Sequence, residues 1–375
     1  MPIACQQKIH HGPQFCVADC PVNTPCGVFE FCRIKSGDQE LPKQDSRCID
    51  IAILDMNHGW PNLGHDSLVH LVQDAACDVL DALKSTGIML RAISFDVRRA
   101  GVIPEGPGGR FAVYAGTGGP GHLDPSRNDG RSAGSQGIQE NPQWERPLFQ
   151  LFDAIRADRD AVLLAVCHTF GVMCRWTGIG TPQLRGPEKG GKSTGVLENM
   201  LTSEAHSHPW FRGLSDTLRH DRIRIMDNRL YDVLPTGVGR NGWTVLGHET
   251  LGVGGPRGEA LTMVEWERDS GGVMPRIFGV NHHPEIVDRG RQLMILQRKR
   301  DRGEVSKKWF EERLEILTRT YPDEDSEQRL ALTSDYTIVG PLRFHIYRQI
   351  RLRAAALGHS VHFHEDELLS HAAHS

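Results

Sequence analysis

The sequence predicts an α/β fold in which a doubly wound, largely parallel sheet is flanked by helices. An apolar, β-branched run at 48–56 is typical of a buried strand. In the next segment, 66–87, apolar residues recur at helical spacing between Asp66, a candidate N-cap, and Gly87, just past the expected helix end. A second apolar run follows at 88–97. Strand, helix and strand in this order form a βαβ unit, whose strands are parallel.

The sequence predicts that the chain has three parts. Residues 1–46 carry cysteine, proline and glycine without clear periodicity, so we expect a cysteine-rich, irregular N-terminal extension. Residues 47–290 form the α/β domain. Charged segments with helical character dominate from 291 to 375 and predict a helical C-terminal extension. Further strands of the domain are expected at 110–116, 160–167, 260–267 and 276–283.

Composition and charge argue against several classes of protein. The 43 Lys and Arg residues against 47 Asp and Glu give a net charge of -4, so no nucleic-acid partner is implied. No apolar run approaches the roughly 18 residues that a membrane helix needs, and the first residues lack the apolar core of a secretory signal. We therefore expect a cytoplasmic protein, and the sequence leaves a monomer and a homo-oligomer both open.

Cys167 is a candidate nucleophile because it stands where the predicted strand 160–167 ends and the sequence turns polar. If a helix begins after it, the helix N-terminus favours the thiolate and the turn lifts the sulfur out of the sheet. An isolated cysteine in such a run is more often a half-buried core residue. The hypothesis of a nucleophile therefore depends on partners elsewhere in the chain.

Two other segments supply such partners. A nucleophilic cysteine needs a base, and the base needs an acid to orient it. His283 and Glu285 are two residues apart at the end of a predicted strand, so their side chains can project to the same side. The glycine-rich segment 115–125 directly follows another strand and can present backbone N–H groups to an oxyanion. Each segment alone is also explained as an ordinary turn.

In this order, the three segments resemble the class I glutamine amidotransferase family, the type with a Cys-His-Glu triad. The resemblance covers about residues 48–290 and implies a flavodoxin-like amidotransferase domain. The family has a Gly-Gly-Pro-Gly oxyanion loop, a nucleophilic cysteine and a His-Pro-Glu motif. The corresponding residues are Gly118, Gly119, Pro120 and Gly121 for the loop, Cys167 for the nucleophile, and His283 and Glu285 for the last motif.

The resemblance also implies a mechanism. Cys167 would attack the carbon of a small-molecule amide, His283 would shuttle the proton, and Glu285 would orient the imidazole. Backbone N–H groups near Gly119 and at His168 would hold the oxyanion. A thioester would form and water would hydrolyse it, without any cofactor.

The chain departs from the family around the nucleophile and the base. The family's nucleophile elbow is the strand-to-helix turn that carries the cysteine, and it commonly reads Gly-x-Cys-x-Gly-x-Gln. In this chain, Ala165, Thr169 and Gly171 stand in place of its two glycines and its glutamine. The first two predict a different, strained turn. Gly171 occupies the position that helps to bind glutamine, so we expect a substrate other than simple free glutamine. Asn281 and His282 stand where the family often has Gln-Phe.

Three functions follow from these observations. The first is an enzyme that cleaves or transfers an amide, of γ-glutamyl type, through Cys167. Because the chain carries no recognisable synthetase motif, the second is a glutaminase subunit that supplies ammonia to a separate synthetase or acceptor enzyme. The third is a non-catalytic binding or scaffolding protein whose two end segments contact partners.

Two further sequence patterns could indicate a phosphate-binding loop and a metal site. The segment 186–193 matches the phosphate-loop pattern around Lys192, but no buried strand precedes it, so we favour a mobile loop that covers the active site. The N-terminal cysteines have spacings unlike the tight pairs of zinc or iron–sulfur sites, and we favour free thiols over a metal site. The metal candidates that we set aside are Cys16, Cys20, Cys26 and Cys32.

Overall fold

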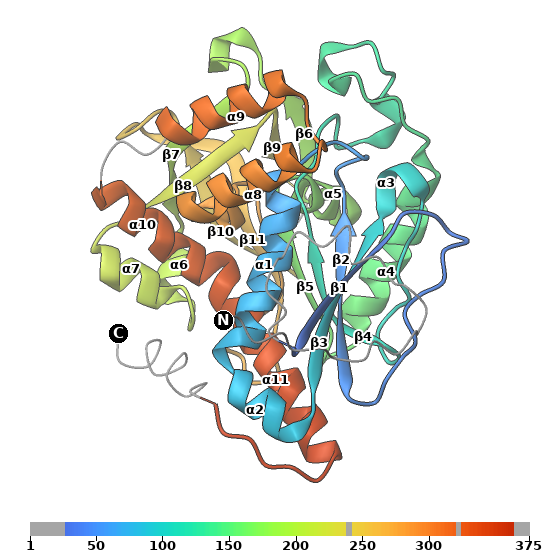
Figure 1. Ribbon diagram of the computed structural model, residues 1–375. Helices are drawn as coiled ribbons and strands as arrows, with labels where there is room; N and C mark the ends of the chain where they lie inside the picture. Colours follow the sequence, from blue (N-terminus) through green and yellow to red (C-terminus); the bar gives the residue numbers. More distant parts are fainter. Residues whose placement is uncertain (1–26, 238–241, 320–323, 364–375) are drawn as a thin grey trace, which may run out of the picture.

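A computed structural model describes residues 27–237, 242–319 and 324–363, and a ten-stranded sheet forms its centre (Figure 1). The strands are β1 (Phe29–Ile34), β2 (Cys48–Asp55), β3 (Met89–Asp96), β4 (Phe111–Gly116), β5 (Val162–Val166), β7 (Ser193–Leu201), β8 (Arg222–Arg229), β10 (Thr244–Thr250), β11 (Arg257–Arg268) and β12 (Pro275–Val280). Their order is β1-β3-β2-β4-β5-β12-β11-β10-β7-β8. Neighbours from β1 to β12 pair in parallel, and those from β12 to β8 pair antiparallel.

Within this sheet, the order β3-β2-β4-β5-β12 is that of a flavodoxin-like fold. Two further strands, β6 (Gly180–Leu184) and β9 (Tyr231–Pro235), form a separate antiparallel pair. The helices are α1 (Leu63–Asp78), α2 (Leu80–Thr86), α3 (Val97–Ala100), α4 (Glu145–Ala157), α5 (His168–Thr177), α6 (Ser203–Ser207), α7 (Arg212–Leu218), α8 (Arg289–Asp301), α9 (Lys307–Arg319), α10 (Glu324–Ser334) and α11 (Gly340–Ala356).

Both faces of the parallel part are buried. Ile51 and Ile53 of β2 belong to the core beneath α1 and α11, whereas Ala52 and Leu54 belong to the core beneath α4 and α5. Successive side chains of a strand point to opposite faces, so a strand that is covered on both sides is apolar at nearly every position. The predicted fold class, a largely parallel sheet flanked by helices with a helical C-terminal region, is confirmed.

The strands predicted from the sequence correspond to β2, β3, β4, β5, β11 and β12. The helix predicted after β2 is divided into α1 and α2 at Val79, and its N-cap is Asn62 rather than Asp66. The Asn62 side chain accepts hydrogen bonds from the N–H groups of Gly64 and His65. Asp66 is instead buried in the first turn, where its carboxylate contacts His65 and Lys299.

The prediction of an irregular segment over 1–46 is wrong for residues 29–34. They form β1, which pairs with β3 at the edge of the sheet. β1 is only partly buried, so it lacks the continuous apolar pattern that identified the central strands, and backbone pairing determines its structure. Cys32 lies on β1, while Cys16, Cys20 and Cys26 lie outside the described residues. The part of the chain that the structure describes has no group of three His, Cys, Asp or Glu residues suited to a metal ion.

The predicted C-terminal helices are present and share the core of the sheet. Ile346 and Ile350 of α11 pack in the same apolar cluster as the strands. Gln292 of α8 donates a hydrogen bond to Ser67 of α1 at 2.7 Å. The Ser334 hydroxyl of α10 donates to the carbonyl of Pro284 at 2.7 Å and so fixes the turn after β12. No helix in the described ranges is long and apolar enough to cross a membrane.

Candidate active site

Cys167 lies in the turn between β5 and α5, at the carboxyl end of a central strand. Its φ of 47° and ψ of -96° are a conformation that residues with a Cβ rarely adopt. The Cys167 N–H donates to the carbonyl of Val280 on β12 at 2.7 Å, and α5 begins at the next residue. Such backbone strain costs about 1–3 kcal/mol and persists only where the surrounding structure imposes it. The sequence-based position of Cys167 at a strand end thus agrees with the structure.

Glycines on the neighbouring strands make room for the two larger residues of this elbow. Ala165 is in register with Gly116 of β4 on one side and with Gly279 of β12 on the other. A Cβ at Gly279 would lie 3.3 Å from the Cβ of Ala165, and a Cβ at Gly116 would overlap the side chain of Thr169. The Thr169 hydroxyl also donates to the carbonyl of Thr117 at 2.7 Å. The elbow therefore packs tightly without its own glycines.

His283 and Glu285 approach Cys167 from the end of β12. β12 pairs in parallel with β5, with Val280 opposite Val166, so the residues that follow the two strands are neighbours. The His283 ring donates from Nδ1 to Glu285 Oε1 at 2.8 Å, and the ring also hydrogen-bonds the thiol of Cys167. The side chains of His283 and Glu285 are both buried. The structure therefore brings the three predicted triad residues together.

The charges around His283 favour its protonated form. Burial lowers the pKa of His283, but Glu285 and Cys167 outweigh burial and raise this pKa well above its ordinary value. The Glu285 carboxylate lies against Gly64 in the first turn of α1, where the helix N-terminus favours negative charge. The adjacent His282 has no such partner: burial and the charge of His283 lower its pKa to about 3. The pKa values of these two neighbouring histidines are therefore shifted in opposite directions.

Gly118, the first glycine of the predicted oxyanion loop, packs directly on His283 and Cys167. A Cβ at this position would lie 2.7 Å from Cε1 of His283 and 3.4 Å from the Cβ of Cys167. Any side chain at Gly118 must therefore push the imidazole away from the sulfur.

We expect Gly118→Ala to lower the rate at which iodoacetamide alkylates Cys167 by about 100-fold, because a misplacement of about 1 Å in a reacting pair has an effect of this size. Mass spectrometry of the Cys167 peptide measures the rate. Gly37→Ala is the control, since a Cβ at Gly37 meets nothing within 4 Å. An unchanged rate in Gly118→Ala would show that the ring and the sulfur do not act as a pair.

Gly119 is held in place by Arg98 from α3. A Cβ at Gly119 would overlap the carbonyl oxygen of Met56. Arg98 donates to this carbonyl at 2.8 Å and to the carbonyl of Pro120 at 2.6 Å. Its Nε and Nη2 both donate to the carboxylate of Glu140 at 2.7 Å, and neither side chain is exposed. A buried, bidentate ion pair therefore anchors the predicted oxyanion loop.

Cys167 and His283 line a cavity of about 110 Å³, and the predicted oxyanion residues Gly119 and His168 line it too. His168 is the first residue of α5, where a helix leaves its backbone N–H without an intrahelical partner. Burial lowers the pKa of the His168 imidazole well below its ordinary value, so the ring itself is neutral. The other residues of the lining are Trp60, Pro61, Asn62, Pro120, Gly121, Leu123, Gln136, Lys192, Asn228, Arg229, Leu230, Tyr231, Asn281 and Arg313.

Gly171, which was predicted to help bind the substrate, does not line this cavity. It is buried in α5, and a Cβ there would overlap the side chain of Leu123, which does line the cavity. Leu123 thus fills the space next to the position where the family carries its glutamine-binding side chain. Sequence reasoning missed Leu123, because nothing in the sequence pairs it with Gly171.

Two cations in the lining were also not assigned to the site from the sequence. Lys192 belongs to the connection between β6 and β7 and lines the Cys167 cavity. Arg313 belongs to α9, beyond the segment that carries the family resemblance. A basic residue on a charged helix carries no sequence signal of this role.

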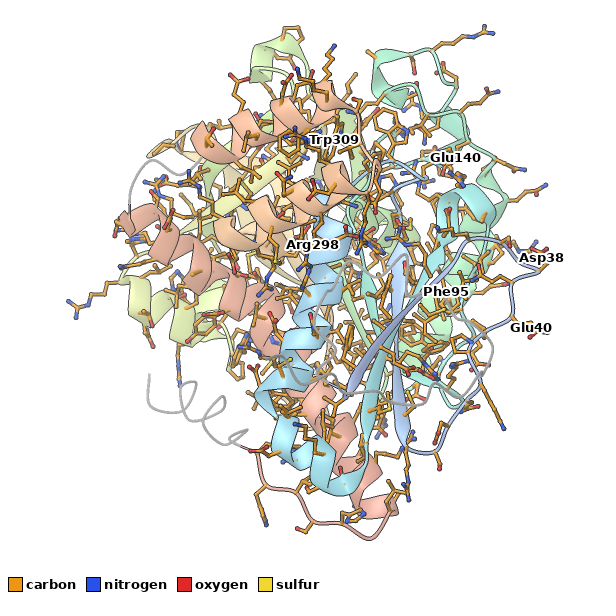
Figure 2. All side chains as sticks on the ribbon, viewed as in Figure 1. Asp38, Glu40, Phe95, Glu140, Arg298 and Trp309 are labelled. Atoms are coloured by element: carbon orange, nitrogen blue, oxygen red, sulfur yellow. The ribbon has the colours of Figure 1, made fainter. Side chains whose placement is uncertain are left out.

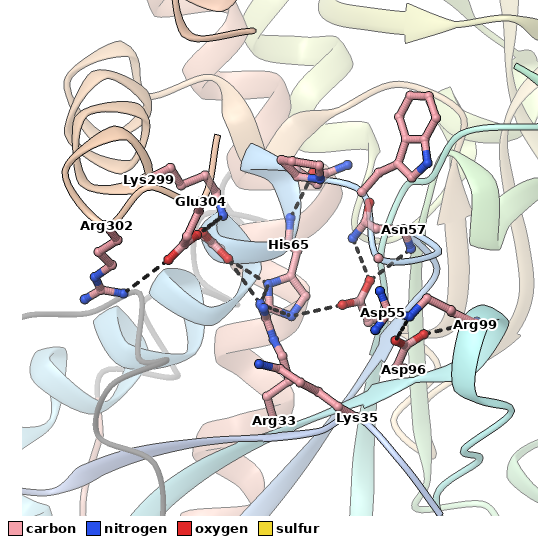
Figure 3. Close-up of a pocket in the computed structure, with 15 residues that line it drawn as sticks. Arg33, Lys35, Asp55, Asn57, His65, Asp96, Arg99, Lys299, Arg302 and Glu304 are labelled. Atoms are coloured by element: carbon pink, nitrogen blue, oxygen red, sulfur yellow. Dashed lines mark hydrogen bonds and ion pairs between the residues drawn. The ribbon is translucent and has the colours of Figure 1, made fainter. Parts of the chain in front are cut away.

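A second cavity, of about 280 Å³, lies at the carboxyl ends of β1, β2 and β3 (Figure 3). It shares Trp60, Pro61 and Asn62 with the Cys167 cavity. Its lining includes opposite charges that pair with one another, such as Lys299 with Asp66 at 2.7 Å. Cys167 and His283 line the 110 Å³ cavity and do not line this one, so the smaller cavity is the candidate active site.

No protein-family model matches the chain, and no curated protein is similar to it in sequence. Solved structures with a similar fold include a glutamine amidotransferase from Methylobacillus flagellatus, with 12% identity over 86% of this chain and 92% of that chain and a TM-score of 0.40. A protein from Thermoplasma acidophilum that is described as a GMP synthase subunit has 12% identity over 66% and 90% of the two chains and a TM-score of 0.35. Sequence identities and TM-scores this low indicate no function, so the function is inferred from the geometry of the site.

Proposed function

We propose that the chain is a cysteine-dependent enzyme that cleaves or transfers an amide, with Cys167, His283 and Glu285 as its triad. One observation carries the proposal. A cysteine held with positive φ at a strand end meets a buried histidine that is charged by its neighbours and oriented by a carboxylate. This combination of strain, burial and orientation is what a nucleophile, its base and an orienting acid require.

The reaction follows from these groups. Cys167 Sγ bonds to the carbonyl carbon of the amide while His283 holds the thiol proton. The oxyanion then lies against the N–H groups of Gly119 and His168. His283 gives its proton to the departing nitrogen, the C–N bond breaks, and ammonia or an amine leaves an acyl thioester. Water, activated by His283, hydrolyses the thioester to a carboxylate and restores the thiol.

The packing of Leu123 against Gly171 supports a substrate other than simple free glutamine. In this position an apolar side chain replaces a hydrogen-bonding one, and a site without a specific polar partner discriminates poorly for the group that needs it. An amide of γ-glutamyl type with a larger leaving amine is the substrate class that we favour. The alternative is a glutaminase subunit that delivers ammonia to a synthetase partner.

An electrophilic γ-glutamyl analogue is expected to label Cys167, because the triad makes this sulfur the reactive thiol of the chain. Labelling should be lost in Cys167→Ala and reduced at least about 100-fold in His283→Ala, which removes the base. Mass spectrometry of the intact chain and of the Cys167 peptide measures both. Cys77→Ala, which removes an exposed thiol on α1, is the matched control and should label normally.

Two further outcomes separate the alternatives. If neither this analogue nor a panel of other amide-directed electrophiles labels Cys167, the chain is a binding or scaffolding protein and the proposal is wrong. Release of ammonia from free glutamine by the purified chain alone would favour the glutaminase subunit over an enzyme with a different substrate.

A further inference from the structure

Lys192 and Arg313 bring two positive charges to the Cys167 cavity from different parts of the chain. Lys192 precedes β7, and Arg313 lies on α9. Among the residues that the structure describes, no acidic side chain forms an ion pair with either of them. The Arg313 guanidinium lies over the ring of Trp309, 5.3 Å from its centroid, which positions this charge without neutralising it. Trp309 is labelled on α9 in Figure 2.

Arg229, a third cation of the same cavity, differs from Lys192 and Arg313 because it has acidic partners. Its guanidinium lies 2.9 Å from Glu249, 3.2 Å from Asp227 and 3.4 Å from Asp232. These carboxylates match its charge, and they also hold Lys189 at 2.8 Å from Asp232. The positive charge that lacks a partner in the cavity therefore comes from Lys192 and Arg313.

The site holds these two charges at an electrostatic disadvantage. Burial lowers the pKa of Lys192 and the positive charge of Arg313 lowers it further, and together they outweigh Cys167 and Asp227, which raise it. Burial also lowers the pKa of Arg313 and outweighs the charge of Glu312, which raises it. Two partly desolvated like charges repel each other, and an anion placed between them would remove this repulsion.

Asn281 provides an independent indication of a ligand that accepts hydrogen bonds. Its side chain is 3% exposed and lines the same cavity, yet its Nδ2 has no hydrogen-bond partner in the described structure. Buried donors are almost always paired in folded proteins, so an unpaired one in a cavity indicates a missing acceptor. A carboxylate offers only acceptors, and so matches both the two cations and this donor.

We propose that Lys192 and Arg313 form an anion subsite that binds a carboxylate of the amide substrate next to Cys167. This inference rests on the proposed function and narrows it: the substrate is an amide that carries a free carboxylate, as γ-glutamyl amides do. α9 then contributes to substrate selection from outside the segment that carries the triad.

Alkylation by iodoacetate and iodoacetamide tests the subsite, because the two reagents react alike and differ in charge. In each case the thiol sulfur displaces iodide and loses its proton. We expect the ratio of the iodoacetate rate to the iodoacetamide rate to be about tenfold higher at Cys167 than at the exposed Cys77 of the same chain. Lys192→Met with Arg313→Gln should return the ratio at Cys167 to that at Cys77, and Lys192→Arg should keep it high.

Lys308→Met is the matched control, since Lys308 is an exposed cation on the same helix as Arg313. It should leave the ratio unchanged, and thermal unfolding should show that all variants are folded. A ratio at Cys167 that equals the ratio at Cys77, or that survives the double substitution, overturns the subsite. If instead Cys167 reacts no faster than Cys77 with either reagent, the proposed nucleophile fails and the subsite fails with it.

Discussion

Replacing Glu285 with glutamine is expected to lower the reactivity of Cys167 by about 10³ to 10⁴-fold while the fold remains intact. Glutamine keeps the shape of the side chain but removes the negative charge that holds a protonated His283 in a buried site. The amide can also present N–H to the ring and turn it to the wrong tautomer. Labelling of Cys167 by the electrophilic γ-glutamyl analogue measures the loss.

The same substitution should change how stability depends on pH. The folded-state pKa of His283 is raised above its unfolded value, so its stabilising contribution is fully present below the unfolded pKa of about 6.5 and is lost as pH rises through the folded value. In Glu285→Gln, only Cys167 remains to oppose burial, so this pKa falls. The variant should therefore be destabilised most between about pH 5 and 6.5.

Urea unfolding of both proteins across this pH range measures the effect. Glu311→Gln, at an exposed position on α9, is the control and should behave like the natural protein. Equal destabilisation of Glu285→Gln at all pH values would show that His283 is not protonated by its contact with Glu285.

Replacing Arg98 with methionine is expected to reduce the free energy of unfolding by about 3–5 kcal/mol, because Glu140 is left as a buried charge without its partner. The substitution also removes the donor that holds the carbonyls of Met56 and Pro120, so the oxyanion loop should loosen and labelling of Cys167 should fall. Chemical denaturation and the labelling rate measure the two effects separately.

A second substitution separates charge from shape at this position. Arg98→Met combined with Glu140→Gln removes both charges and should recover part of the lost stability, although the loop stays unanchored and labelling stays low. If the double variant is as unstable as Arg98→Met alone, the unpaired Glu140 is not the cause of the destabilisation.

The sequence alone determined those elements whose residue pattern is compatible with a single type of structure. β2 and β5 are buried and apolar at nearly every position because both faces of the sheet are covered, and this pattern identifies them as central strands. Their carboxyl ends then place Cys167, and the order of the motifs places His283 and Glu285 next to it. The candidate triad and the fold class could therefore be predicted from the sequence.

Only the tertiary structure decided the surroundings of these residues. β1 has a weak sequence pattern and is fixed by its pairing with β3. Gly116 and Gly279 accommodate the unusual elbow from neighbouring strands, and Leu123 fills the space next to Gly171. These contacts join residues that are distant in the chain and share no periodicity, so no local pattern encodes them.

The same reason explains why the sequence predicted the proposed triad but not the proposed anion subsite. Cys167 and His283 occupy strand ends, which parallel pairing of β5 and β12 must bring together. Lys192 and Arg313 come from a connecting segment and from a C-terminal helix, where basic residues are ordinary surface positions. The sequence determined the proposed nucleophile, because its place at a strand end follows from a local pattern. The packing of α9 against α8 and the path of the 186–193 segment decided which charges line the cavity, because long-range contacts place them there.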